Sequence, residues 1–140
     1  MSWIFYALGA ISVIAISDLF RKLGSNLQDP FFSNLIFQAG GISMAVILWL
    51  LFSRRLEVSN SKGVIYALIG GLLVSMFTTF VFKALEIGPG VSTVIPVVRV
   101  GGVILVAILG ILIFSEKLTW NLALGVVLAT SGVYLIFSGR

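Results

Sequence analysis

The chain has 140 residues, of which 59% are hydrophobic and 10% are charged, and its formal net charge is +4. Ordinary soluble domains are roughly 25% charged, so this chain cannot cover a globule with polar surface and is predicted to be an integral membrane protein. It contains no cysteine and no histidine. Disulfides, Cys/His metal sites, thiol nucleophiles and histidine acid–base chemistry are therefore excluded.

Five apolar runs approach or meet the length of about 20 residues that a helix needs to cross roughly 30 Å of hydrocarbon. They extend over residues 3–20, 32–52, 63–82, 91–114 and 118–137. Short links between the runs carry nearly all the charge, and aromatic residues gather near the run ends, as in a membrane-interface belt. We therefore expect one all-α transmembrane domain over residues 1–140. No basic segment precedes the first run, so we expect it to remain as a spanning helix.

Small residues recur at helical spacing in three of the runs. Lipid does not drive helices together, so close approach at small side chains contributes much of their association. The longest set, in the third run, has a spacing of four residues: Ala67, Gly71, Ser75 and Thr79. The shorter pairs are Gly41 with Ala45 and Gly125 with Ala129. These sets predict helix contacts, although glycine is also common in membrane helices generally.

Charge in the links indicates no preferred orientation. With five spans, one side of the membrane would receive Arg54, Arg55, Lys62 and Lys117, and the other Arg21, Lys22, Lys83 and Arg140. Because loop Lys and Arg normally set orientation, this balance predicts insertion in both directions and hence an antiparallel homodimer. Alternatively, residues near the termini or the hydrophobicity of single helices set one orientation. We expect these cations to meet lipid headgroups, and we expect no nucleic-acid partner.

The second half of the sequence carries an ordered series of short motifs. They are FKALEIGPG at 82–90, VIP at 94–96, IFSEKLT at 113–119, Gly125, and SGV at 131–133. This order resembles the EamA repeat of the drug/metabolite transporter superfamily, closely over residues 78–137 and more loosely, through helix count and Arg21-Lys22-Leu23-Gly24, before that. The resemblance implies a small-molecule transporter in a prokaryotic inner membrane.

Most members of that superfamily resemble two fused repeats with ten helices, whose halves insert in opposite orientations. This chain holds one repeat, so the resemblance also implies an antiparallel homodimer, with the substrate path along its two-fold axis. The small multidrug resistance proteins are similar single-repeat relatives in which a first-helix glutamate couples drug to protons. Ile14 stands at the corresponding position here, and no acid precedes Asp18, which disfavours proton-coupled export of lipophilic cations.

Arg99 lies inside the fourth run, about eight residues or roughly 12 Å from its start. A charge within a span costs about 2.5 to 3.5 kcal/mol even on the gentler insertion scale, so it normally faces a partner, a bundle interior or a water-filled cavity. One helix face holds small or polar residues at helical spacing: Ser92, Arg99, Gly102 and Gly110. This stripe predicts a functional face on the fourth helix.

Pro96 lies three residues before Arg99. Because proline lacks an N–H and its ring clashes one turn back, the Ser92 carbonyl would lose its helical partner and the helix would bend or break. Broken helices beside a charge are a frequent way to build a transporter site. We therefore expect a site for an anionic group, such as a carboxylate or phosphate. Its predicted substrate-binding residues are Ser92, Pro96, Arg99 and Gly102.

Charged residues near the predicted helix ends offer a competing interpretation of Arg99. It could snorkel to the membrane surface, or pair structurally with Asp18 or Glu86. We interpret Asp18, Lys83 and Glu86 as interface residues that stay in contact with water, and a gating ion pair is the second interpretation.

Gly88, Pro89 and Gly90 predict a tight turn between the third and fourth helices. A hinge that serves alternating access is the second interpretation of these three residues. Such a turn would let the third and fourth helices lie antiparallel.

The sequence contains no P-loop, no paired carboxylates on one helix face, no nucleophile–base pair and no metal-ligand spacing. We therefore expect no enzymatic activity, no metal and no cofactor. The predicted function is permeation of a small molecule, an anionic or zwitterionic metabolite, by alternating access. The alternative is a non-transporting accessory subunit of a larger membrane complex, such as a lipid-carrier flippase.

Overall fold

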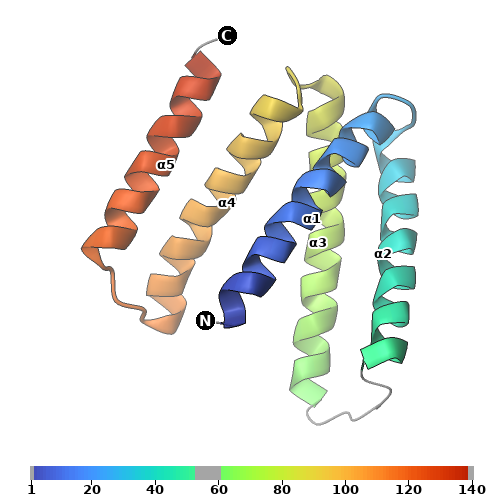
Figure 1. The fold of residues 1–140 in the computed structure, drawn as a ribbon, viewed down its shortest axis with the longest axis horizontal. Coiled ribbons are helices and arrows are strands. Elements are labelled where there is room, and N and C mark those ends of the chain that lie inside the picture. The colour runs from blue at the N-terminus through green and yellow to red at the C-terminus, as the bar shows by residue number, and fades with distance from the viewer. Residues whose placement is uncertain (1, 53–60, 139–140) are drawn as a thin grey trace. The chain divides into compact units, whose positions relative to one another are not determined.

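The computed structural model describes residues 2–52 and 61–138. Its five helices are α1 (Ser2–Ser25), α2 (Pro30–Phe52), α3 (Ser61–Ile87), α4 (Val91–Phe114) and α5 (Trp120–Ser138) (Figure 1). All five are long and apolar enough to cross a membrane. Within these two ranges there is no β-strand. The predicted all-α fold with five membrane-spanning helices is therefore confirmed.

Two helices begin at side chains that cap them. Asp29 Oδ1 accepts hydrogen bonds from the backbone N–H groups of Phe31 at 2.9 Å and Phe32 at 3.1 Å, at the start of α2. Thr119 Oγ1 accepts the N–H of Leu122 at 3.2 Å, at the start of α5. Each cap satisfies helix donors that have no intrahelical partner, a contribution of typically about 1 kcal/mol.

Helices α1 and α3 each extend five residues further at the C-terminal end than predicted, to Ser25 and Ile87 rather than to 20 and 82. Arg21 and Lys22 are therefore helical residues of α1, and not loop residues. Lys83 and Glu86 are likewise part of α3, where Lys83 Nζ and Glu86 Oε2 form an exposed ion pair of 2.7 Å. The length of the apolar run underestimates the length of both helices, because specific partners hold their charged last turns in helical conformation.

Helix α4 runs without interruption from Val91 to Phe114, with Pro96 inside it. The helix is therefore not broken at Pro96, and the alternative, a bend there, stays a prediction. Pro96 is only the sixth residue of the helix, so it removes one N–H close to the helix start and most of the hydrogen-bond ladder is intact. Gly90, immediately before the helix, has φ of 144°, a backbone conformation that favours glycine.

The end of α4 is a compact turn. Ser115 has φ of 53°, in the left-handed region, and the N–H of Glu116 donates to the carbonyl oxygen of Gly110 at 3.4 Å. A Cβ atom on Gly110 would lie 2.8 Å from Glu116 Oε2. The absence of a side chain at Gly110 thus gives the Glu116 carboxylate room to fold back over the last turn of the helix.

The helices form two compact units, divided at Gly88. In the first unit, α3 contacts both α1 and α2, and α1 also contacts α2. Figure 1 shows α1 crossing α3, which lies beside α2. In the second unit α4 packs against α5. The Gly88-Pro89-Gly90 link is therefore the place where one unit ends and the other begins.

Buried side chains of the first unit concentrate where α1 ends, α2 begins and α3 ends. The buried apolar residues here are Val81, Phe82 and Leu85. The buried polar and charged residues beside them are Asp18, Arg21, Ser25, Ser33, Asn34 and Thr78. By contrast, every residue of α3 from 62 to 74 is exposed. A polar interior of this kind needs hydrogen-bond partners in a membrane, so the specific contacts of the unit lie at this end.

Candidate functional site

The buried charge of the first unit is an ion pair within α1. Arg21 Nη1 donates to Asp18 Oδ1 at 2.8 Å, and each side chain is only 5% exposed. The expectation that Asp18 stays wet at a helix end is therefore wrong. Because α1 continues past Arg21 and packs against two other helices, both charges are withdrawn from solvent together. Mutual neutralisation is what makes such burial tolerable.

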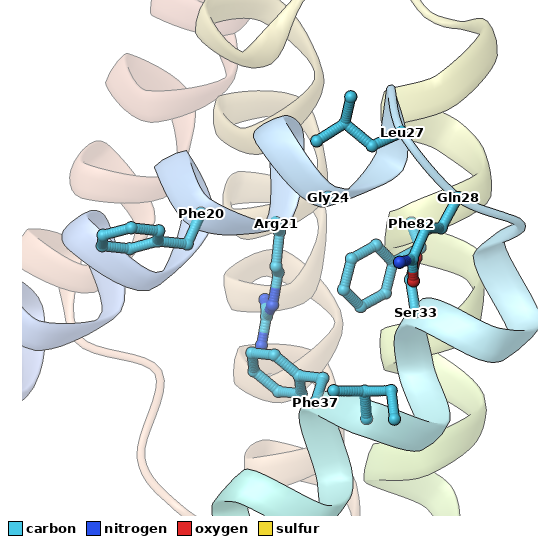
Figure 2. Close-up of a pocket in the computed structure, with 9 residues that line it drawn as sticks. Phe20, Arg21, Gly24, Leu27, Gln28, Ser33, Phe37 and Phe82 are labelled. Carbon is cyan, nitrogen blue, oxygen red and sulfur yellow. The ribbon is translucent and has the colours of Figure 1, made fainter.

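Aromatic rings link Arg21 to the other two helices. Its guanidinium carbon lies 4.4 Å from the centre of the Phe37 ring of α2, a cation–π contact. The Phe37 ring meets that of Phe82, on α3, edge to face at 5.9 Å between centres. Figure 2 shows Arg21 extending from α1 toward Phe37. One row of contacts therefore joins α1, α2 and α3.

Polar bonds reinforce the same three-helix contact. Lys22 Nζ donates to the carbonyl oxygen of Leu85 at 2.6 Å, joining α1 to the last turn of α3. Asn34 Nδ2, on α2, donates to Thr79 Oγ1 at 2.8 Å and to the carbonyl oxygen of Ser75 at 3.2 Å. Ser75 and Thr79, two members of the predicted small-residue ridge, thus lie in a helix contact made by hydrogen bonds.

The remaining predicted packing residues lie outside such contacts. Ala67 and Gly71 are exposed, because α1 and α2 bury only the C-terminal half of α3. A Cβ atom on Gly71 or on Gly125 would meet nothing within 4 Å. Ala129, on α5, is half-buried. Within the described part of the chain, hydrogen bonds place Ser75 and Thr79 of the ridge in a helix contact, and the packing role of the other members stays a prediction.

A cavity of about 260 Å³ is lined by Arg21, Phe37 and Phe82, the residues of these contacts, and by six others. Its lining residues are Phe20, Arg21, Gly24, Leu27, Gln28, Ser33, Ile36, Phe37 and Phe82 (Figure 2). The lining is mostly apolar, with Arg21, Gln28 and Ser33 as its polar members. Ser33 is 8% exposed, and its Oγ has no hydrogen-bond partner among the described residues. This pocket brings together a cation, aromatic rings and a hydroxyl that has no partner among the described residues.

The predicted substrate-binding residues all lie on α4, in the second unit. Arg99 is half-buried and is the ninth residue of the 24 in the helix, and Pro96 is also half-buried. Ser92 and Gly102 are exposed, and a Cβ atom on Gly102 would meet nothing within 4 Å. Their assignment to a substrate site stays a prediction. Gly88, Pro89 and Gly90 lie outside the helices, between α3 and α4.

Sequence reasoning missed the cluster in the first unit. Arg21 was counted as a loop cation, although Asp18 and Arg21 have the spacing of three at which helical side chains meet. Asn34 also carried a signal, because an amide in an apolar run often hydrogen-bonds to a neighbouring helix. No comparable signal marked Phe37 or Phe82, whose roles depend on which helix faces meet.

The model of the EamA-like transporter family matches residues 1–138 of the chain. The chain belongs to the EamA-like transporter family. The match extends over all five helices, so the resemblance carried by the motifs after residue 78 includes the first unit as well. This EamA-like protein is therefore a multi-pass membrane protein of the transporter type. Comparison with the curated proteins and with the solved structures found no match.

Proposed function

We propose that this EamA-like protein moves a small anionic or zwitterionic metabolite across a prokaryotic inner membrane by alternating access. The observation that carries the proposal is Arg99, a half-buried cation well inside the apolar helix α4. A cation at that depth is costly unless it meets a counter-charge, a polar interior or water. Carboxylates and phosphates are the groups that the planar guanidinium fork binds best, so a substrate that carries one of them suits a site at Arg99.

The working unit in this proposal is an antiparallel homodimer. One repeat per chain and the four-against-four balance of the cations at and between the helix ends support it. Exposed glycines with open space around them, including Gly41, Gly71 and Gly125, offer surfaces on which another helix can approach closely. The two-unit division at Gly88 supports the proposed hinge, because Gly88, Pro89 and Gly90 join parts that pack separately.

Binding and exchange measurements with purified protein test the role of Arg99. A panel of small carboxylates and phosphate esters is screened for thermal stabilisation in detergent, and a ligand that binds is followed by counterflow in proteoliposomes. We expect Arg99→Gln to abolish binding and exchange, and Lys117→Gln, which removes an exposed cation after α4, to retain both. Equal activity of the two variants would remove Arg99 from the substrate site.

Reporter fusions test the dimer. Two C-terminal reporters, each active on a different side of the membrane, should both give a signal on the same chain. A signal from one side only would exclude dual topology. Exchange that requires a second, different protein would instead identify the chain as an accessory subunit.

A further inference from the structure

We propose that the pocket beside Arg21 binds an amphipathic molecule, with an anionic or strongly hydrogen-bond-accepting oxygen placed against Ser33 and its apolar part outside the pocket. The pocket lies wholly within the unit formed by α1, α2 and α3, whereas Arg99 lies on α4. The inference therefore does not depend on the proposed transport site.

The size of the pocket limits what it can enclose. Sites for complete drug-sized ligands occupy about 300 to 1,000 Å³. A cavity of about 260 Å³ therefore accommodates a headgroup-sized fragment rather than a whole amphiphile. The rest of the ligand must lie along the outer surface of the unit.

The lining of the pocket and that of its neighbour differ in polarity. Phe20 and Ile36, in the lining of the pocket, belong to spanning helices and are 69% and 56% exposed. Leu27 and Gln28 are shared with an open depression of about 570 Å³, which Ser25, Asn26, Asp29 and Glu86 complete. Exposed apolar residues in the lining and a polar hollow next to it suit a molecule with a tail and a headgroup.

The depth of the pocket matches the headgroup level of a bilayer. Ser33 is the fourth residue of α2, and Arg21 lies four residues before the end of α1. At 1.5 Å per residue, both stand about one helical turn inside the ends of their spans. This is the interfacial layer in which headgroups and hydrocarbon meet.

The Ser33 hydroxyl indicates which kind of ligand atom fits the pocket. A buried hydroxyl without a partner forfeits a hydrogen bond, so a ligand oxygen that accepts from Ser33 Oγ satisfies it. The Arg21 guanidinium also lines the pocket, but it is paired with Asp18 and lies over the Phe37 ring, so the Ser33 hydroxyl is the contact for the ligand oxygen.

Ligand binding to the purified full-length protein tests the inference. The probes are decyl phosphate, decanol, inorganic phosphate, phosphatidylglycerol and phosphatidylethanolamine, with native mass spectrometry and thermal unfolding in detergent as readouts. We expect saturable binding of decyl phosphate and no comparable binding of decanol or inorganic phosphate. The decanol hydroxyl is a weaker hydrogen-bond acceptor than a phosphate oxygen, and inorganic phosphate has no apolar chain. Retention of one phospholipid would identify membrane lipid as the source, and decyl phosphate binding alone would identify a free amphiphile.

Two substitutions at Ser33 and one control separate the pocket from nonspecific lipid association. Ser33→Ala, which removes only the hydroxyl, should weaken decyl phosphate binding roughly 10- to 150-fold, the value of one hydrogen bond to a charged group. Ser33→Leu should abolish binding by filling the pocket. Ser43→Leu is the matched control, since Ser43 is an exposed α2 serine that bonds to its own helix at Ala39.

The proposal is wrong if Ser33→Ala binds decyl phosphate as the wild type does, or if Ser43→Leu loses binding as fully as Ser33→Leu. Equal binding of decanol or inorganic phosphate would also overturn it. Arg99→Gln should keep the amphiphile site, so failure of transport and failure of this pocket are distinguishable.

Discussion

Lys22 Nζ donates a hydrogen bond of 2.6 Å to the carbonyl oxygen of Leu85, at the end of α3. In a longer helix this carbonyl would accept the N–H of residue 89, but residue 89 is a proline and has none. Lys22 therefore supplies a donor that the sequence removes, and it places a positive charge at the negative end of the α3 dipole.

Substitution of Lys22 by methionine should destabilise the first unit. Leu85 is fully buried, and a hydrogen bond from a charged donor contributes about 1.5 to 3 kcal/mol, so we expect a loss in that range. Thermal or denaturant unfolding in detergent measures it. Lys83→Met is the control, because the exposed Lys83–Glu86 pair contributes only about 0 to 1 kcal/mol. Equal losses for the two variants would contradict the role given to Lys22.

The buried Asp18–Arg21 pair should be sensitive to loss of one partner. Asp18→Asn removes a carboxylate that is paired with the buried Arg21 guanidinium and should cost about 3 to 5 kcal/mol. The double variant Asp18→Leu with Arg21→Met should recover much of that stability, because it buries no charge. A double-mutant cycle in detergent measures the coupling. Additive losses would show that the two residues act independently.

The number of helices in this fold could be predicted from apolar run length, but the helix ends could not. The membrane requires about 20 apolar residues per span, so five such runs define five helices. Arg21 and Lys83 end the apolar runs, yet α1 and α3 continue past them. Their charged side chains find partners in Asp18, the Leu85 carbonyl oxygen and Glu86. Hydropathy records neither tertiary contacts nor local ion pairs, so it does not predict these last turns.

The two candidate sites differ in how visible they are in the sequence. Arg99 stands out because apolar residues enclose it on both sides, and a charge there needs a reason. Arg21 comes directly after the end of an apolar run, so sequence alone predicts an ordinary loop cation. Its pocket forms only because the faces of α2 and α3 bring Phe37 and Phe82 to it, and a single sequence does not specify which faces meet.

Asn34 should contribute modestly to the contact between α2 and α3. Asn34→Leu removes the donor to Thr79 and Ser75, and hydrogen bonds between membrane helices average about 0.6 kcal/mol, with model peptides giving up to about 2. We expect a loss in that range, with Thr79→Val reproducing part of it. Thr130→Val is the control, because the exposed Thr130 hydroxyl bonds only within α5. A loss at Thr130 as large as that at Asn34 would argue against an interhelical role.

Gly71→Leu tests how far the small-residue ridge extends. A side chain at this position meets nothing within 4 Å, so the unfolding temperature of the monomer in detergent should be unchanged. A lower proportion of dimer, measured by crosslinking in membranes, would place Gly71 at the proposed homodimer interface. A marked loss of monomer stability would instead mean that α3 packs along its whole length, contrary to its exposed first half.

Gly90→Ala should be costly, whereas Gly88→Ala should be tolerated. Among the described glycines only Gly90 has positive φ, at 144°, and an L side chain in such a conformation costs about 1 to 3 kcal/mol. Because Gly90 precedes α4 directly, the strain would fall on the start of that helix, where the N–H groups of Thr93 and Val94 donate to the Gly90 carbonyl oxygen at 3.1 and 3.0 Å. Unfolding in detergent compares the two variants. Equal stability of the two variants would show that the link relaxes into another conformation. Counterflow with the Gly90 variant would then show whether the proposed hinge depends on the positive φ at Gly90.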